Sequence, residues 1–231
     1  MKLSVIIPVY NENKNIIKVI EEVNAVDIKK EIIVIDDGSN DGTQETLRNL
    51  NTNNIIKVFH EKNRGKGAAI RTGLKYVTGN IVIIQDADFE YNPQEYSLLI
   101  QPILDGKTQI VYGSRFYFPL KHKKSNYHFY YHFLLGVKFL NFLTYLLYGA
   151  KITDEATCYK VFRTDVIKNI DLKCEGFDFC PEITAKLCKK GYTIHEVPIS
   201  YSGRTFEEGK KINWKDGLRA IYILIKYRLV D

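Results

Sequence analysis

Three carboxylates follow one predicted strand almost without interruption. In the stretch VIIQDADFEYNP, residues 82–93, Asp86 and Asp88 stand one residue apart after a run of buried-strand residues, and Glu90 follows. Carboxylates this close repel one another and raise each other's pKa unless a positive charge compensates them. The spacing therefore indicates a cation at this point of the chain. The alternative is that one aspartate only caps the following turn.

The segments around these acids alternate between strand and helix patterns. Apolar runs predict strands at residues 3–10, 31–36, 55–60, 80–85 and 108–115. Helical periodicity and helix-start residues predict helices at 11–23, through Leu50, at 63–77, and from Pro93 to about Asp105. Such alternation predicts an α/β fold with a mostly parallel, Rossmann-like central sheet and helices on both faces.

Polar side chains gather where three of these strands end. The clusters are Tyr10 to Glu12, Asp36 with Asp37, and Asp86 to Glu90. In open sheets of this kind, ligands bind beyond the carboxyl ends of the strands. We therefore expect the three clusters to share one site.

The composition limits the class of protein. The 231 residues suit one domain with a sizeable core, and a net charge of +6 fits an anionic ligand or membrane surface without requiring nucleic acid. The four cysteines form no C-x-x-C pair, which argues against zinc and favours reduced thiols in the cytoplasm. The opening MKLSVIIPVYNEN is too soon interrupted by polar residues to be a secretory signal.

Three familiar nucleotide or metal motifs fail on inspection. The stretch GKGAAI, residues 65–70, lacks the third glycine of a dinucleotide fingerprint and follows the third predicted strand instead of the first. The stretch DDGSNDGT lacks the alternating ligands and terminal glutamate of an EF-hand. A Walker A loop is absent from the sequence.

Eight stretches in register resemble the family 2 glycosyltransferases, which have a GT-A fold. These are VIIPVYNE, VIDDGSNDGT, NRGKGAAIRTG, QDADFEYNP, YGSR, TDEATCYKVFR, FDFCPEITAKL and VPISYSGRTFEEGKKINWKDGLRA. The last three are similar to the polyprenyl-phosphate branch, which includes dolichol-phosphate mannose or glucose synthases. The resemblance covers nearly the whole chain. Members often carry transmembrane helices after the catalytic domain, and this sequence shows none there.

The resemblance implies a metal-dependent donor site. Asp86 and Asp88 match the family's D-x-D and Glu90 stands at a third ligand position; Mg²⁺ or Mn²⁺ held there would stabilise the leaving diphosphate, with Asp88 counted as catalytic. Asp37 and Ser39 are expected to shape a turn, and Arg64 to contact the diphosphate or lie in a solvated basic loop. The donor-binding residues implied are Pro8, Tyr10, Glu12, Asp36, Lys66, Asp86, Ala87, Asp88, Arg204, Lys210 and Lys211.

The acceptor determines which other groups are needed. A phosphate monoester, with a second pKa of about 6, is already an anionic nucleophile at neutral pH and needs cations but no strong base. By resemblance, Arg115 is the catalytic, acceptor-binding arginine, and Glu182 also belongs to the acceptor site. Asp154 and Glu182 would orient the sugar or hold loops, and Arg163 would bind the phosphate or support the fold.

An aromatic-rich segment at residues 127–150 is long enough to suggest a membrane span. Spanning would separate Asp86 from Arg204, which the donor site requires together. We expect a helix lying in the membrane interface instead, with Lys121, Lys123 and Lys124 facing anionic headgroups; the alternative is a buried core helix. An amphipathic helix at 214–230 could share that interface.

The sequence thus predicts one GT-A domain over residues 1–231, with a donor-binding half at 1–115 and an acceptor- and membrane-facing half at 116–231. The expected enzyme moves a hexose, with inversion, from a GDP-mannose- or UDP-glucose-type donor to a polyprenyl phosphate, peripherally on the cytoplasmic face of a membrane. A separate membrane protein or a second copy of the chain could assist attachment. Alternatives are a family 2 enzyme acting on a glycan hydroxyl, with Asp154 or Glu182 as base, and a non-catalytic nucleotide-sugar-binding protein. A nucleotidyltransferase would need an N-terminal glycine-rich loop that is missing.

Overall fold

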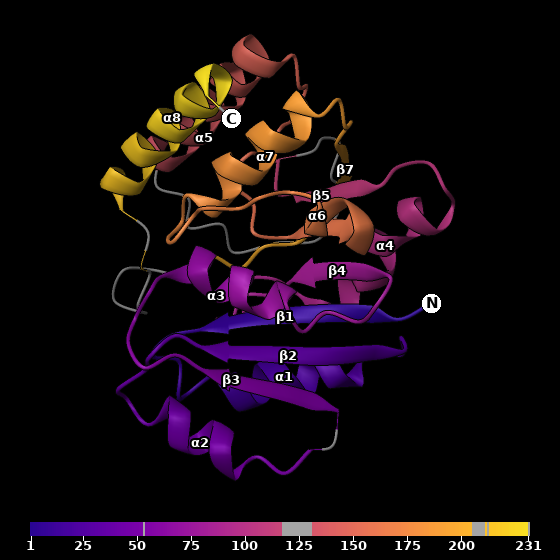
Figure 1. Cartoon of the computed structure of the whole chain (residues 1–231), viewed down its shortest axis with the longest axis vertical. Helices are drawn as coiled ribbons and strands as arrows, with labels where there is room; N and C mark the ends of the chain where they lie inside the picture. Colours follow the sequence, from indigo (N-terminus) through magenta and orange to yellow (C-terminus); the bar gives the residue numbers. More distant parts are fainter. Residues whose placement is uncertain (53, 117–130, 205–210, 212, 231) are drawn as a thin grey trace.

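The structure, a computed structural model, describes residues 1–52, 54–116, 131–204, 211 and 213–230. Within these residues, seven strands form one sheet in the order β3-β2-β1-β4-β6-β5-β7 (Figure 1). The strands are β1 (Leu3–Val9), β2 (Lys30–Asp36), β3 (Ile55–Phe59), β4 (Ile81–Ile84), β5 (Ile110–Ser114), β6 (Lys160–Arg163) and β7 (His195–Pro198).

The sheet is mostly parallel, as the alternation of strand and helix predicted. β1 lies at the centre of the N-terminal half, with Ile6 opposite Ile33 of β2 and Ile84 of β4, and all three pairings from β3 to β4 are parallel. β6 runs antiparallel to both β4 and β5, while β5 and β7 are parallel. The sequence patterns predicted neither β6 nor β7, because each is only four residues long.

Helices cover both faces of this sheet. Successive strand residues point to opposite faces, so Val5 and Ile7 pack with α1 (Ile16–Ala25), α2 (Thr43–Asn49) and α4 (Tyr96–Leu104). Ile6 faces the other way and packs with α3 (Lys66–Leu74), α6 (Thr164–Lys168) and α7 (Phe179–Lys189). Both core clusters consist largely of isoleucine, valine and leucine, the composition expected of a sheet buried on both faces.

The predicted start of the fourth helical region is confirmed. The Asn92 side chain accepts a hydrogen bond from the Gln94 backbone N–H at 3.0 Å, and Pro93 opens a short 3₁₀ helix, η1 (Pro93–Glu95). A proline fits there because the first N–H of a helix has no partner within the helix. α4 continues from η1 and ends at Leu104, next to the predicted Asp105.

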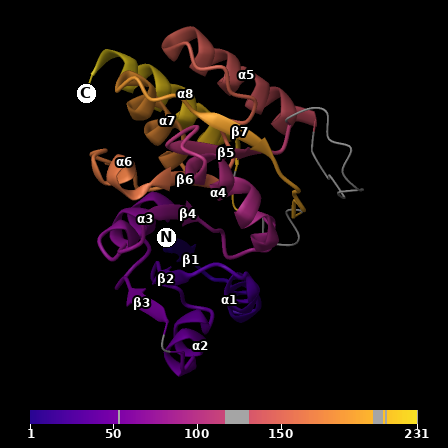
Figure 2. The ribbon, with the colours of Figure 1, turned by 90° about the vertical axis from the view of Figure 1, so that its right-hand side faces the viewer.

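Two further helices form an outer layer on α7. α5 (Tyr131–Tyr148) and α8 (Trp214–Leu229) meet α7 in a third apolar cluster that includes Leu140, Ala185 and Leu224. Figures 1 and 2 show this layer at one end of the molecule and α2 at the other. The predicted C-terminal helix is confirmed, and α5 occupies most of the predicted 127–150 segment.

The membrane expectations are answered in part. No helix in the described part of the chain is long and apolar enough to cross a bilayer. α5 is also not a fully buried core helix, because only one side of it packs on the protein while Phe142 and Leu146 are 59% and 65% exposed. Lys121, Lys123 and Lys124 lie outside the described residues.

Candidate functional site

A cavity of about 430 Å³ opens at the carboxyl ends of β1, β2 and β4. Parallel strands bring their carboxyl ends to the same edge, so clusters far apart in sequence meet there. Of the residues predicted to bind donor, metal or acceptor, the cavity is lined by Pro8, Tyr10, Glu12, Lys66, Asp86, Ala87, Asp88, Glu90, Arg115, Arg204 and Lys211. Lys210 lies outside the described residues.

The carboxylates after β4 are compensated by two cations from distant segments. Lys66, the first residue of α3, forms an ion pair with Asp86. Arg204 reaches Asp88 with a guanidinium nitrogen at 2.8 Å, and its backbone N–H donates to Glu90 at 2.9 Å. The positive charge that the sequence required is therefore present in the protein itself.

This compensation is unequal between the two aspartates. Burial by itself raises the pKa of Asp86, but the adjacent Lys66 brings it below its ordinary value. Burial, together with repulsion from Asp86 and Glu90, raises the pKa of Asp88 to about 7 despite the opposing charge of Arg204. Asp88 thus remains short of positive charge in the arrangement shown.

The chemistry of these groups fits Mg²⁺ or Mn²⁺. Asp86 and Asp88 line the cavity and offer the hard oxygen donors that these ions prefer. Among the described residues, no three acidic, histidine or cysteine side chains converge in a ready-made metal site. Asp86 and Asp88 are the residues that would hold such an ion.

Glu12 ties the C-terminal cations to the first strand. Its carboxylate accepts from Arg204 at 3.1 Å and from Lys211 at 2.9 Å, and it is itself buried. Lys211 also donates to the Tyr10 carbonyl at 2.5 Å. Glu12, Arg204 and Lys211 thus form one hydrogen-bonded group of charged residues in the cavity lining.

Both aspartates at the end of β2 accept hydrogen bonds from backbone N–H groups of nearby loops. One Asp36 carboxylate oxygen accepts from the Gly38 and Ser39 N–H groups at 3.1 and 3.0 Å, so Asp36 shapes the turn. Asp37 lines the cavity instead and accepts from the Arg64 and Gly65 N–H groups at 3.0 and 2.7 Å. The other Asp36 oxygen, Oδ2, is buried without a hydrogen-bond partner among the described residues, so the donor contact expected of Asp36 stays a prediction.

Arg64 is not among the residues that line the cavity. Its backbone N–H is held by Asp37, but its side chain lines a second groove behind α3. Of the two basic residues of this loop, Lys66 alone is among the residues that line the cavity.

Arg115, just after β5, lies at the junction of the charged end and an apolar end of the cavity. It makes a two-pronged ion pair with Asp154, with nitrogen–oxygen distances of 2.7 and 2.7 Å, and burial next to that carboxylate leaves its pKa well above the ordinary value. Its guanidinium also lies 4.9 Å from the Tyr201 ring centre. Because Asp154 is fully buried and bound to Arg115, it is not placed as a free base for a hydroxyl acceptor.

Glu182 and Arg163 lie away from the cavity. Glu182, on α7, accepts from the Lys186 ammonium at 2.5 Å and from the Lys173 N–H at 2.7 Å, and it is absent from the cavity lining. Arg163 pairs with the neighbouring Asp165 at 2.8 Å on the surface. The structure gives both residues roles in holding local structure and brings neither to the site.

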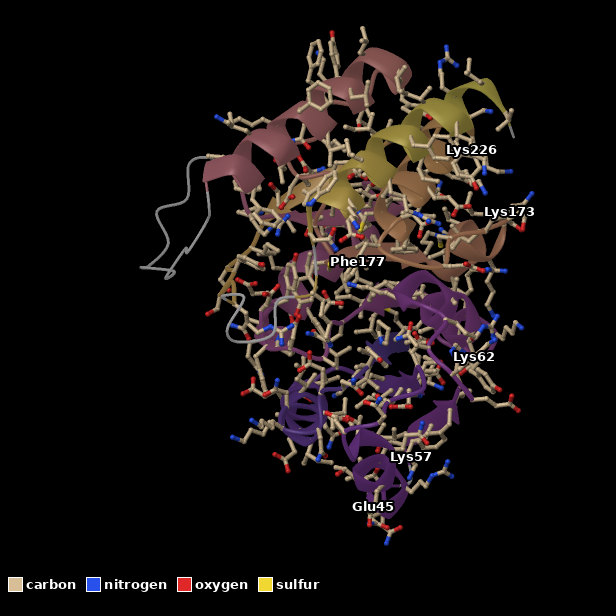
Figure 3. The ribbon with its side chains drawn as sticks, turned by 90° about the vertical axis from the view of Figure 1, so that its left-hand side faces the viewer. Glu45, Lys57, Lys62, Lys173, Phe177 and Lys226 are labelled. Carbon is tan, nitrogen blue, oxygen red and sulfur yellow. The ribbon has the colours of Figure 1, made fainter. Side chains whose placement is uncertain are left out.

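Several cavity residues were missed by the sequence patterns. Glu155, Cys158 and Cys180 line the wall opposite β1, and burial raises the pKa of Glu155. Phe177 lies 5.9 Å from the Lys66 ammonium, and Figure 3 shows it between the outer helices and the N-terminal strands. Glu155 and Cys158 fall within TDEATCYKVFR, and Phe177 and Cys180 fall within FDFCPEITAKL, so the quoted motifs contain all four although none was named as a site residue.

The far end of the cavity is apolar and is formed by the outer layer. Phe133, Val137 and Leu140 of α5 and Gly217 and Ala220 of α8 all contribute to its lining. The small residues Gly217 and Ala220 leave the space that a larger side chain would fill. A ligand with a charged head and an apolar tail therefore fits this cavity.

Comparisons with known proteins agree with this geometry. Residues 4–171 match the family model described as Glycosyl transferase family 2. The chain is 30% identical to the UDP-N-acetylglucosamine–dolichyl-phosphate N-acetylglucosaminyltransferase of Methanococcus voltae over 97% of its own length and 95% of that protein. It is 31% identical to the dolichol-phosphate mannosyltransferase of Pyrococcus furiosus over 98% of its own length and 64% of that protein.

Solved structures support the fold. Glucosyl-3-phosphoglycerate synthase from Mycobacterium tuberculosis, in complex with Mn²⁺, UDP and glucosyl-3-phosphoglycerate, superposes with a TM-score of 0.72 at 19% identity. The superposition covers all of this chain and 81% of that one. At this identity the likeness concerns the α/β architecture.

Proposed function

The chain belongs to glycosyl transferase family 2 and is a glycosyltransferase, and from that premise we propose that it moves a hexose-type sugar from a nucleoside-diphosphate sugar to a polyprenyl phosphate such as dolichyl phosphate. The observation that carries the proposal is the composition of one cavity. Its charged end holds Lys66, Asp86, Asp88 and Arg204, and its apolar end lies between α5 and α8. A nucleotide-sugar matches the first end, and the start of a polyprenyl chain matches the second.

The donor diphosphate is assigned to the charged end. Lys66 and Arg204, now paired with Asp86 and Asp88, would turn to the diphosphate oxygens, and Lys211 would close beside them. Mg²⁺ or Mn²⁺ held by Asp86 and Asp88 would supply charge stabilisation to the leaving nucleoside diphosphate. Asp37, Tyr10 and Pro8 line the part of the cavity left for the nucleoside.

The acceptor phosphate is assigned to Arg115. Asp154 fixes the guanidinium plane, and a guanidinium can hold a phosphate through paired hydrogen bonds. A phosphate oxygen is already ionised at neutral pH, so it can attack the anomeric carbon without a base. Attack from the side opposite the leaving diphosphate inverts that carbon.

The exposed apolar surface of the outer layer is proposed as the membrane contact. Leu135, Phe139, Phe142 and Leu146 recur along α5, and Trp214, Leu218, Tyr222, Ile225 and Leu229 recur along α8, all of them exposed. Lys215, Arg219 and Arg228 on α8 are also exposed beside these apolar residues. Apolar residues with basic neighbours suit an interface with anionic lipid headgroups.

The test is transfer from a panel of nucleotide-sugars to a short polyprenyl phosphate with Mg²⁺. Formation of a polyprenyl-phosphate sugar from at least one donor supports the proposal and identifies the base and sugar. Transfer to a glycan hydroxyl, with no transfer to the lipid phosphate, would establish the alternative acceptor class. Nucleotide-sugar binding without any transfer would favour the non-catalytic alternative.

A further inference from the structure

A second groove, of about 670 Å³, lies on the other side of α3 from the donor cavity. It runs between α3 and α6 and is closed by residues 169–172. Four basic side chains line it: Arg64, Arg71, Lys75 and Lys168. Figure 3 shows Lys62 and Lys173 on the same edge of the molecule. We call this the basic groove.

The four cations of the basic groove are not neutralised. Among the described residues, none of them forms an ion pair with a carboxylate. The one acidic residue in the lining, Asp171, is 3.6 Å from Lys173 and its side chain is 83% exposed. Unneutralised charge of one sign in a concave surface concentrates counter-ions there.

Two of these cations are nevertheless held in place. The Arg71 guanidinium donates to the Lys173 and Cys174 carbonyls at 3.5 and 3.4 Å, and the Lys168 ammonium donates to the Val77 carbonyl at 2.8 Å. Carbonyl oxygens orient a cation without cancelling its charge. Arg71 and Lys168 therefore lose less side-chain freedom on binding an anion than free surface cations would.

From these observations we propose that the basic groove binds a small phosphate-bearing anion. We further propose that this binding alters the loop of residues 64–66, which reaches the donor cavity. Two arginines and two lysines supply guanidinium and ammonium donors, both of which bind phosphate oxygens well. This site is separate from the donor cavity, whose cations are Lys66, Arg115, Arg204 and Lys211.

A chain of three polar side chains joins the two sites. Thr72, in the wall of the basic groove, has its hydroxyl 2.9 Å from His60 Nε2. The other ring nitrogen of His60 lies 2.6 Å from the Asp37 carboxylate, which lines the donor cavity. Asp37 and His60 are both buried, so water does not compete for these contacts.

Arg64 provides a second connection. Its side chain lines the basic groove, while its backbone N–H is bound by Asp37 on the cavity side. The next two residues, Gly65 and Lys66, line the donor cavity. An anion that draws the Arg64 side chain into the groove would therefore alter the loop that presents Lys66.

The binding test uses inorganic phosphate and pyrophosphate as probes in isothermal titration calorimetry. The double variant R71Q/K75Q removes half of the groove's cations, and K14Q/K18Q removes two exposed lysines from the region of α1 as a matched control. We expect the groove variant to weaken one pyrophosphate site at least about tenfold and the control to change affinity less than about twofold. Equal weakening in both variants means unspecific attraction, and no effect of R71Q/K75Q means binding in the donor cavity alone; either result overturns the proposal.

Binding to lipid vesicles distinguishes a small anion from a membrane surface as the ligand of the basic groove. If R71Q/K75Q reduces binding to phosphatidylglycerol vesicles but not to pyrophosphate, the groove serves lipid headgroups and the proposal is wrong.

The coupling test measures amide hydrogen exchange over residues 60–66. We expect pyrophosphate to slow exchange at Arg64 and Gly65 more strongly in the wild type and in K14Q/K18Q than in R71Q/K75Q, in which binding in the donor cavity alone remains. Unchanged exchange in the wild type, with pyrophosphate bound, would overturn the coupling. Neither readout depends on sugar transfer, so failure of this proposal and failure of the proposed function are distinguishable.

Discussion

Arg204 lies on the second aspartate of the D-x-D, 2.8 Å from the Asp88 carboxylate, although 115 residues of chain stand between them. The same guanidinium reaches Glu12 at 3.1 Å. A single cation from the C-terminal region therefore connects the ends of β1 and β4. Under the proposed function, donor and metal would displace this contact, so the cluster of carboxylates and cations is the place to test that function.

Chelation should abolish sugar transfer, and Mg²⁺ or Mn²⁺ should restore it, because the leaving diphosphate carries concentrated charge. Asp88→Ala should lose metal-dependent nucleotide binding in calorimetry while its circular dichroism spectrum stays that of the wild type. Full activity in EDTA, or in Asp88→Ala, would remove the assigned metal role of Asp88.

Asp88→Asn should raise the melting temperature of the metal-free protein at pH 8 and leave it nearly unchanged at about pH 4. The pKa of Asp88 is raised to about 7 in the folded state, so its favourable contribution is complete below about pH 4 and is lost as the pH rises through 7. Replacing the carboxylate removes that loss, a gain on the order of 1 kcal/mol. Asp105→Asn is the control: its pKa is lowered by Lys107, so no gain is expected at pH 8. Equal melting temperatures for wild type and Asp88→Asn at pH 8 would contradict the unequal compensation.

Arg115→Ala should reduce transfer to polyprenyl phosphate by at least about a hundredfold while leaving the donor dissociation constant within about threefold. Removing Arg115 alone strands the buried Asp154 charge, which costs about 3–5 kcal/mol of stability. The double variant Arg115→Ala/Asp154→Asn avoids this and should restore the melting temperature but not the transfer. Recovery of transfer in the double variant would show that Arg115 acts only on the fold.

Phe142→Ser with Leu146→Ser should weaken binding to anionic vesicles by about tenfold, since two exposed apolar side chains of α5 are lost. Tyr76→Ser with Leu98→Ser, which removes exposed apolar residues elsewhere, should have little effect. Vesicle binding should also fall with added salt, and further when Lys121, Lys123 and Lys124 are changed to Ser. Co-sedimentation that is equal for all variants, and equal for neutral and anionic vesicles, would exclude this surface as the membrane contact.

Gly65→Ala should destabilise the protein by about 3 kcal/mol or more, whereas Gly106→Ala should cost only about 1 kcal/mol. Both glycines have positive φ, at 93° and 69°, but a Cβ on Gly65 would lie 2.3 Å from the Glu175 carbonyl oxygen while one on Gly106 meets nothing within 4 Å. Urea unfolding of the two variants isolates the cost of this close approach. Similar losses of stability for both variants would mean that the cost of Gly65→Ala comes from the backbone conformation and not from contact with residues 175–176.

The sequence predicted the N-terminal half well because each signal there is local. Strand runs such as EIIVID end in polar residues, and Pro93 after Asn92 marks a helix start that the structure confirms. The strands β6 and β7 were not predicted, because four-residue strands carry little periodicity and pair with strands that are distant in the sequence.

The site residues show the same difference between local sequence signals and contacts that are distant in the sequence. Glu12, Lys66, Asp86, Asp88 and Arg204 were placed together by resemblance, and the cavity does contain them. The different hydrogen-bond partners of Asp36 and Asp37 could not be predicted, because the direction of each side chain depends on the turn that follows β2. The pairing of Arg115 with Asp154 depends on a contact across 39 residues, which no local pattern records.

The position of β6 has a consequence for the order in which the molecule opens and forms. β4 and β5 do not pair with each other; each pairs with β6, and only three residue pairs join β4 to it. The sheet therefore becomes continuous only when residues 160–163 are in place, and these residues are far from β4 and β5 in the sequence. During synthesis, the first four strands can assemble before residues 160–163 are made. The second half of the sheet must then pair with them through the three residue pairs between β4 and β6. Native-state hydrogen exchange should accordingly show the β4–β6 amides opening at lower free energy than those between β1 and β2, whose register spans seven pairs.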